Sequence, residues 1–192
     1  MKFTAKDLIN VGIFTVLYMI VLVVVGQLSA LLPITQVLAP LYLPIVAGIP
    51  FMLFLTRVKH FGMVTLMGLL VGLIILATGQ SYFVPIFAVV LAPLADYIMS
   101  RGQYKRFGFL VPGYAVFSLI MAGTVAPLYF MRQAFIEKIS ARHDAAWVQQ
   151  LVDWTPGWMF AVTIVMIIVG AIAGAYVGRA MLRKHFERAG IA

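Results

Sequence analysis

Apolar residues fill most of the chain in long runs that short polar segments separate. Most runs approach the ~20 residues that an α-helix needs to cross ~30 Å of hydrocarbon. The pattern predicts an all-α integral membrane protein, a single domain over residues 1–192 built as a six-helix bundle. The expected helices span approximately 7–30, 40–55, 61–78, 82–99, 107–129 and 156–182. Six crossings would return both termini to one side.

Basic residues stand beside alternate ends of these runs. Eleven of the fourteen fall on one set of ends: Lys2, Lys6, Arg57, Lys59, Arg101, Lys105, Arg106, Arg179, Arg183, Lys184 and Arg188. Basic residues close to a crossing resist translocation, so these segments and both termini are expected in the cytoplasm. The other ends carry Arg132, Lys138 and Arg142, offset by Glu137, Asp144 and Asp153. We therefore expect a multi-pass protein of the cell membrane.

The composition excludes several classes of protein. With 64% hydrophobic and 10% charged residues, the chain has too few polar residues to cover a soluble globule. Its net charge of +8 lies in short loops, which favours topology signals and lipid contacts over nucleic acid. Cysteine is absent, and no GxxxxGK[ST] or HExxH motif occurs. His60, His143 and His185 stand apart. The sequence predicts no catalytic residue, no cofactor, no metal and no enzymatic activity.

Prolines and glycines shape two of the expected helices. Pro40, Pro44 and Pro50 each remove a backbone donor, which predicts a short or kinked helix with an irregular outer half. Such irregularity is tolerated in a membrane where it lines a cavity; equally, Pro40 and Pro44 could belong to an outer loop. Gly170, Gly174 and Gly178 recur at every fourth position, as do Gly68 and Gly72. These faces predict close helix packing within the bundle, which we favour over a dimer interface.

The termini of two helices carry capping signals. Thr4 to Asp7 has the form of a capping box at the start of the first helix. Thr155 followed by Pro156 predicts a cap and a first-position proline for the last helix.

The only long polar segment, residues 132–153, lies between the fifth and sixth runs. Apolar residues recur in it at near-helical spacing, which predicts one or two amphipathic helices on the outer surface. Tyr129, Trp147, Trp154 and Trp158 cluster at the same level. As an aromatic belt they would anchor the interface, and this is the default interpretation. Alternatively, the segment covers an outward-facing pocket as a lid, since it is longer than a turn requires.

Asp96 is the one carboxylate inside an apolar run. Its cost in the bilayer requires compensation by neighbouring groups. We favour an ion pair with Arg101 or Lys105, or a contact with a partner subunit. A proton relay is disfavoured because it needs a chain of titratable groups.

Neutral polar residues and aromatics gather at the outer ends of the runs. If the bundle is compact, they would converge on a pocket for a small, partly aromatic, polar or anionic solute, although each taken singly is an ordinary interface residue. The candidate substrate-binding residues are Gln27, Gln36, Tyr42, Gln80, Tyr82, Tyr129, Arg132, Trp154 and Trp158.

Four short motifs resemble a known family. They are residues 4–15 (TAKDLINVGIFT), 38–42 (LAPLY), 79–80 (GQ) and 92–96 (APLAD). Together they resemble the S components, the substrate-binding subunits, of energy-coupling factor (ECF) transporters, most closely the branch called MptD or Trep_Strep. The resemblance implies a protein of the prokaryotic plasma membrane with six helices and a solute pocket closed by outer loops. It also implies three partners, a membrane T component and two cytoplasmic ATPases, with no ATP site on this chain.

The resemblance further implies a docking face on the first helix. S components carry two small residues four apart there, which pack against the T component. Gly12 and Val16, with Thr15 adjacent, occupy the matching positions, and Val16 departs from the usual alanine. We expect a subunit that binds a vitamin or precursor outside and releases it inside. The alternative is a membrane scaffold or assembly protein that acts through its glycine faces.

Overall fold

The computed structural model describes residues 3–188, and within that range every regular element is a helix. Lys2 and the side chains of His185 and Arg188 lie outside the described part. A 3₁₀ turn, Leu119–Met121, joins α5 to α6. The α-helices are α1 (Ala5–Ser29), α2 (Pro33–Leu55), α3 (Met63–Ala77), α4 (Phe83–Arg101), α5 (Phe107–Ser118), α6 (Ala122–Phe130), α7 (Arg132–Ser140), α8 (Ala145–Trp154) and α9 (Met159–Arg188).

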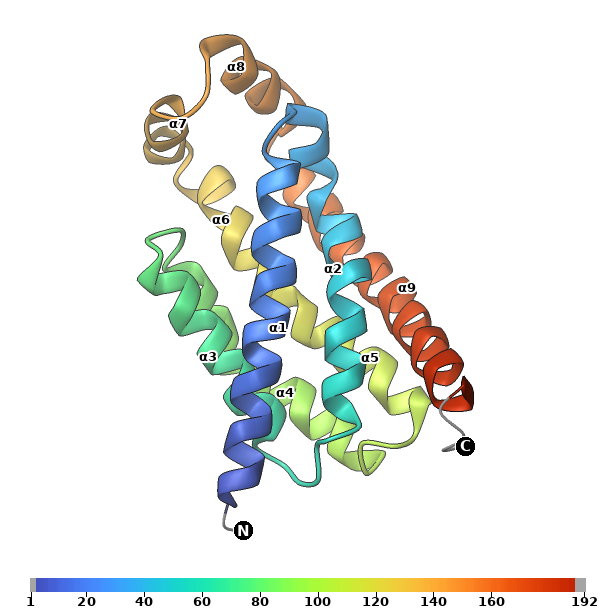
Figure 1. Cartoon of the computed structure of the whole chain (residues 1–192). Coiled ribbons are helices and arrows are strands. Elements are labelled where there is room, and N and C mark those ends of the chain that lie inside the picture. The colour runs from blue at the N-terminus through green and yellow to red at the C-terminus, as the bar shows by residue number, and fades with distance from the viewer. Residues whose placement is uncertain (1–2, 189–192) are drawn as a thin grey trace.

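Among the described residues, five helical segments are long and apolar enough to cross a membrane. They are α1, α2, α4, the combined α5–α6 segment and α9; the apolar α3 has fifteen residues and is shorter. α1 begins and α9 ends at the same end of the molecule, and α7 and α8 lie at the opposite end (Figure 1). We call these the terminal end and the α7–α8 end.

The structure corrects the expected bounds of the second helix. α2 begins at Pro33 and runs unbroken through Pro40, Pro44 and Pro50, so a start near residue 40 and an outer loop containing two of these prolines are both wrong. Pro33 sits at the first turn, where a helix needs no N–H donor. α9 packs against the α2 backbone beside these prolines, and the Tyr114 hydroxyl of α5 donates to the Pro44 carbonyl at 2.7 Å. Protein cover of this kind lets helices tolerate proline in a membrane.

The start of the last helix also differs from the expectation. α9 begins at Met159, three residues beyond Pro156. Thr155 ends α8 instead of capping α9, because its hydroxyl donates to the Leu151 carbonyl at 2.6 Å. The capping box at Thr4 is confirmed, with the Thr4 and Asp7 side chains each accepting from the other's backbone N–H.

The regular glycines of α9 pack against the backbone of α2. A Cβ atom added at Gly170 would lie 1.9 Å from the Leu41 carbonyl oxygen. The corresponding distances are 2.3 Å from Gly174 to Pro44 O and 2.7 Å from Gly178 to Gly48 O. In α3, a Cβ at Gly68 would lie 2.4 Å from the Ala92 Cβ of α4. These glycine faces are therefore used inside the molecule, as the spacing predicted.

Buried aromatic rings fill the centre of the bundle. Phe51 of α2 lies 4.6 Å, ring centre to ring centre, from both Tyr114 and Phe117 of α5. Tyr18 of α1 meets Phe117 edge-on at 5.8 Å. Burial of rings this large, in edge and tilted contacts, dominates the packing energy of such a core.

Asp96 does not form the expected ion pair. Its Oδ2 accepts from the Gly62 N–H, the Thr65 N–H and the Thr65 hydroxyl at 2.8, 2.8 and 2.9 Å, and its Oδ1 accepts from the Tyr104 hydroxyl at 2.5 Å. All four of these groups donate to the Asp96 carboxyl oxygens. Gly62 is the N-cap of α3 and has no side chain to offer, so Asp96 of α4 caps α3 from outside. Arg101 lies over the Tyr97 ring instead.

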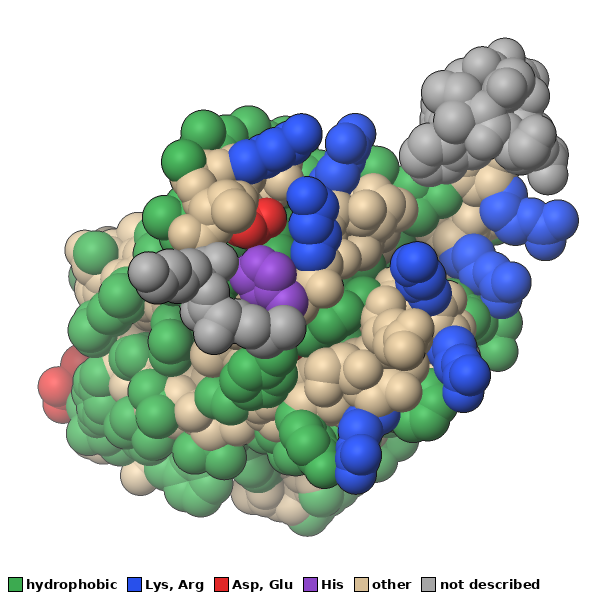
Figure 2. All heavy atoms as spheres, turned by 90° about the horizontal axis from the view of Figure 1, so that it is seen from below, with side chains coloured by type: hydrophobic (Ala, Val, Ile, Leu, Met, Phe, Trp, Pro, Cys, Tyr) green, Lys and Arg blue, Asp and Glu red, His purple; other side chains and the backbone are tan. Residues whose placement is uncertain are grey.

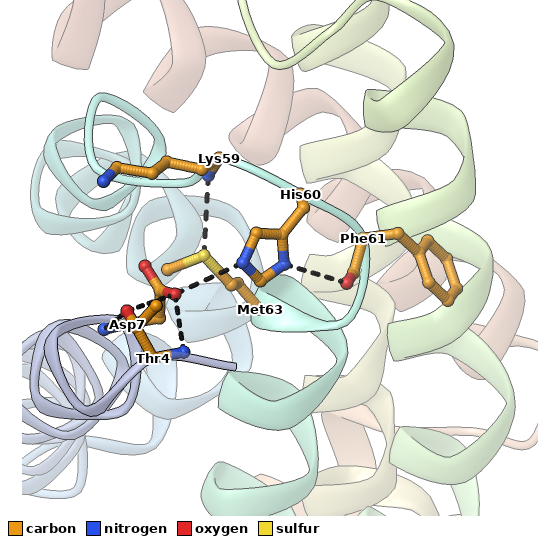
Figure 3. Close-up of polar contacts among 6 residues, drawn as sticks. All are labelled: Thr4, Asp7, Lys59, His60, Phe61 and Met63. Carbon is orange, nitrogen blue, oxygen red and sulfur yellow. Dashed lines mark hydrogen bonds and ion pairs between the residues drawn. The ribbon is translucent and has the colours of Figure 1, made fainter. Parts of the chain in front are cut away.

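Basic side chains gather at the terminal end (Figure 2). Within this face, the buried Asp7 carboxylate joins the start of α1 to the α2–α3 loop. His60 Nε2 lies 3.3 Å from Asp7 Oδ2, and the His60 Nδ1 lies 3.4 Å from the Phe61 carbonyl (Figure 3). His60, which the sequence placed alone in a polar flank, thus contacts a carboxylate. Across the described residues, no group of three His, Cys, Asp or Glu side chains is arranged to hold a metal.

Candidate solute pocket

A pocket of about 540 Å³ lies at the α7–α8 end of the bundle. Its inner wall is mostly apolar and comes from helices far apart in the sequence: Leu22, Leu43, Ile75, Met121 and Ile167. Pro40 and Pro44 of α2 also line it, as expected for a proline-rich helix half beside a cavity. α7 and the α7–α8 loop supply one side of its rim, and Leu151 of α8 completes the cover. The pocket therefore lies where the bundle meets its amphipathic segment.

Four of the nine candidate binding residues line this pocket: Gln27, Gln36, Gln80 and Tyr129. They come from α1, α2, the α3–α4 loop and α6, so the predicted convergence of polar groups from separate segments occurs for these four. The Tyr129 hydroxyl lies 3.3 Å from the Thr163 hydroxyl of α9, which also lines the pocket. Gln36 Oε1 is buried and has no hydrogen-bond partner within residues 3–188.

The other five candidates lie elsewhere. The Tyr42 hydroxyl is 2.5 Å from Ser29 Oγ and 2.9 Å from the Thr35 carbonyl, where it ties α2 to the end of α1. The Tyr82 hydroxyl contacts the Met131 sulfur beside a smaller pocket of about 260 Å³. Trp154 and Trp158 are 44% and 68% exposed and do not line the main pocket, which agrees with the interpretation as belt residues.

Arg132, the fifth of these, has a structural contact. Its guanidinium donates to the carbonyls of Thr155 and Val152 at 2.7 and 2.6 Å. These are carbonyls at the end of α8, where a helix leaves acceptors unsatisfied. Arg132 therefore fastens α8 to the start of α7, which holds the amphipathic segment together.

Sequence reasoning missed the cations of the rim. Lys138, Arg142 and His143 all line the pocket. The Lys138 ammonium donates to the Gly79 and Gln80 carbonyls at 2.5 and 3.2 Å, and the His143 ring stacks on Trp147 with centres 3.8 Å apart. A signal was present: Phe135, Lys138, Ile139 and Arg142 follow the i, i+3, i+4, i+7 rule for one helical face, and all four line the pocket.

No carboxylate balances these cations at the pocket surface. Of the acidic residues in the segment, Asp144 accepts from the Trp147 N–H at 2.8 Å and caps α8. Asp153 accepts from Gln149 at 2.8 Å, and Glu137 is exposed. None of the three lines the pocket. Within residues 3–188 the Arg142 guanidinium has no hydrogen bond or ion pair, so its donors remain available.

The expected docking residues divide between the surface and the core of the bundle. Val16 is 55% exposed in an apolar strip of α1, and a Cβ at Gly12 would meet nothing within 4 Å. Thr15 is buried, and its hydroxyl donates to the Val11 carbonyl at 2.7 Å. Only Val16 and Gly12 are available to a partner helix.

Comparison with known proteins places the chain in one family. The sequence model of a family described as hypothetical bacterial integral membrane proteins, Trep_Strep, matches residues 5–188. No curated protein and no solved structure matches the chain. Together with its long apolar helices, this match identifies a multi-pass membrane protein, and the chain belongs to the Trep_Strep family of bacterial integral membrane proteins.

Proposed function

We propose that this chain is the substrate-binding S component of an ECF-type transporter. It binds a micronutrient, a vitamin or its precursor, at the outer face, and a T component with two cytoplasmic ATPases drives its release inside. In this proposal α3 crosses the membrane with the five longer segments, and the terminal end is cytoplasmic. The chain itself carries out no chemical reaction.

The observation that carries the proposal is the pocket under α7 and α8. A volume of about 540 Å³ lies within the ~300–1,000 Å³ range of small-molecule sites, which combine apolar walls with a few polar groups. Gln27, Gln36, Gln80 and Tyr129 supply such groups here. A pocket at the outer end of a transmembrane bundle suits capture of a solute from outside the cell.

The surface of α1 is consistent with a membrane partner. Exposed apolar residues surround Gly12, where the backbone is bare enough for close approach of another helix. The basic terminal end, in the cytoplasmic orientation, agrees with the rule that Lys and Arg remain inside.

The competing interpretation, a scaffold acting through its glycine faces, has less support. Gly170, Gly174 and Gly178 already contact α2, and Gly68 contacts α4. These faces are consequently unavailable to other proteins unless the bundle opens.

Co-purification tests the assembly. We expect Gly12→Leu to abolish co-purification with the T component of the same bacterium, because the new side chain would hold the two helices apart. The fold should persist, since the position is open in the structure. Gly108→Leu, at an equally open glycine of α5, is the matched control and should still co-purify. Retained assembly of Gly12→Leu would refute the assignment.

Solute binding is tested separately by thermal unfolding of the purified chain against a panel of vitamins and precursors. A ligand at 100 times its Kd should add ~2.7 kcal/mol to the free energy of unfolding. A panel without any stabilising member would favour the scaffold.

A further inference from the structure

The rim of the pocket is positively charged on one side only. Lys138 lies in the last turn of α7, and Arg142 and His143 follow in the α7–α8 loop, four and five positions later. None of the residues lining the pocket is acidic. The opposite, inner wall is apolar. The site is thus polarised, with fixed positive charge at the mouth and hydrocarbon surface below.

We propose that the solute is an organic anion with an apolar body, held by its acid group at Arg142. The proposal rests on the solute-binding function above and names the class of ligand. A carboxylate, sulfonate or phosphate would accept two parallel N–H bonds from the Arg142 guanidinium. The body of the solute would lie against Leu22, Leu43 and Ile167, and Gln27 and Gln36, which line the same pocket, would bond its remaining polar atoms.

Arg142 is the primary anion ligand because its neighbours are already engaged. The Lys138 ammonium is bound to the carbonyls of Gly79 and Gln80, so it contributes charge more than new hydrogen bonds. His143 is held against Trp147. Among the residues that line the pocket, only the Arg142 guanidinium combines full charge with unused donors, and its planar fork matches an acid group bidentately.

The electrostatics favour an anion over a neutral or cationic solute. Two unbalanced positive charges at the mouth of a cleft raise the local concentration of anions and repel cations. A solute amine would meet the same charges with no carboxylate to receive it. A neutral amide could bond Arg142 but would gain no charge–charge attraction, and its single acceptor oxygen cannot match both arms of the guanidinium as a carboxylate does.

The test uses probes that differ in one functional group. Each set has a carboxylate, the matching primary amide and the matching amine on one apolar body, such as 3-phenylpropionate, 3-phenylpropanamide and 3-phenylpropylamine; further sets use indolyl and cyclohexyl bodies. Thermal unfolding of the purified full chain gives an apparent Kd for each probe. We expect at least one carboxylate to bind about tenfold more tightly than its amide, and no amine to stabilise the protein.

Substitutions of Arg142 test whether this residue causes the preference for the carboxylate probe. Arg142→Gln should remove the preference for the carboxylate while leaving amide binding unchanged, and Arg142→Lys should restore part of it. Arg57→Gln, which removes an exposed arginine at the terminal end, is the control and should behave as wild type. The unfolding midpoint without probe verifies that each variant is folded.

Three results would overturn the inference: equal binding of acid and amide, a carboxylate preference that survives in Arg142→Gln, or no stabilisation by any carboxylate. Tight binding of an amide or amine would contradict the ligand class yet leave the binding subunit intact. Failure of the subunit assignment appears instead in the Gly12→Leu co-purification experiment, which needs no probe.

Discussion

At the scale of single residues, Asp96 carries the most consequence. Its carboxylate is buried between α3, α4 and the loop that follows α4, where it accepts from two backbone N–H groups and two hydroxyls. Burial, together with the hydrogen bond to Asp96, raises the pKa of the Tyr104 phenol, so this group stays protonated and continues to donate. The carboxylate therefore joins three segments through one side chain.

We predict that Asp96→Ala lowers the free energy of unfolding by about 2 kcal/mol, because it leaves the first turn of α3 uncapped and a phenol unpaired. Thermal or denaturant unfolding in detergent measures the loss. Arg101→Ala is the matched control and should fall within about 0.5 kcal/mol of wild type, as an exposed residue without an ion pair to Asp96. Greater destabilisation by Arg101→Ala would restore the ion-pair interpretation.

The sequence correctly predicted that neighbouring groups must compensate the Asp96 carboxylate, but the residues it indicated as partners were wrong. A lone carboxylate in an apolar run must be compensated, and that much follows from the residue alone. The choice of Arg101 or Lys105 relied on proximity along the chain. Gly62 and Thr65 lie more than thirty positions earlier, and no local pattern connects them to Asp96.

Arg132 gives a second prediction at this scale. Arg132→Gln should expose the last turn of α8, because the Thr155 and Val152 carbonyls lose their charged donor. A loss of about 1 kcal/mol of local stability corresponds to roughly fivefold faster amide hydrogen exchange in α8. Gln133→Ala, at the next and exposed position, should leave exchange unchanged. Unaltered exchange in Arg132→Gln would show that α8 is held by its apolar contacts alone.

At the scale of elements, the pairing of α2 with α9 organises the bundle. Glycine and proline are poor helix formers in water, yet α9 carries its regular glycines, and α2 its prolines, along the contact between the two helices. The glycines bring the two backbones together, and the neighbouring helices cover the backbone around the prolines, so α2 stays helical over its whole length. Proline alone was therefore a misleading signal for a short helix, because in a bundle its cost depends on what surrounds the helix.

We predict that Gly170→Ala destabilises the bundle by about 1–3 kcal/mol, the usual cost of overpacking. The added methyl would lie 1.9 Å from the Leu41 carbonyl oxygen, so α2 and α9 must separate. Gly108→Ala adds the same methyl at a helical position with open space and should be neutral or slightly stabilising. Unfolding in detergent compares the two, and equal stabilities would contradict the close contact.

The amphipathic segment illustrates what periodicity can and cannot provide. Its spacing predicted helices, and the structure has α7 and α8 there. The spacing puts the cations at positions 138 and 142 on the same face as Phe135 and Ile139, but it did not indicate that this face lines a pocket. Periodicity identifies a face but not its neighbour, and only the neighbour shows whether a charge faces water or a pocket.

At the scale of the whole molecule, the proposed orientation can be tested directly. The chain has no cysteine, so single cysteines can be introduced without a background. We predict that Ser140→Cys reacts with a membrane-impermeant maleimide in intact cells, whereas Thr56→Cys reacts only after lysis. Both positions are exposed and lie at opposite ends of the bundle. If Thr56→Cys were labelled in intact cells and Ser140→Cys only after lysis, the molecule would have the opposite orientation, with the pocket facing the cytoplasm.

The pocket itself lay beyond the reach of sequence reasoning. The apolar runs correctly placed its polar residues at one common end of the bundle, and four of the nine candidates line the pocket. A cavity, however, is the space that side chains from many elements leave unfilled, and whether Tyr42 turns toward it or toward Ser29 depends on packing. The side chains of Tyr42 and Arg132 are positioned by hydrogen bonds to backbone carbonyls, and a hydropathy pattern does not reveal such bonds.

The shortness of α3 has a consequence for the surrounding lipid. Fifteen residues at 1.5 Å each give a rod of about 22 Å, roughly 8 Å less than the hydrocarbon of an average bilayer. If α3 crosses the membrane as proposed, the acyl chains beside it must compress, and this hydrophobic mismatch costs a fraction of a kcal/mol per ångström. Reconstitution in lipids of decreasing chain length should therefore raise the protein's stability, and thick, sterol-rich membranes should disfavour it.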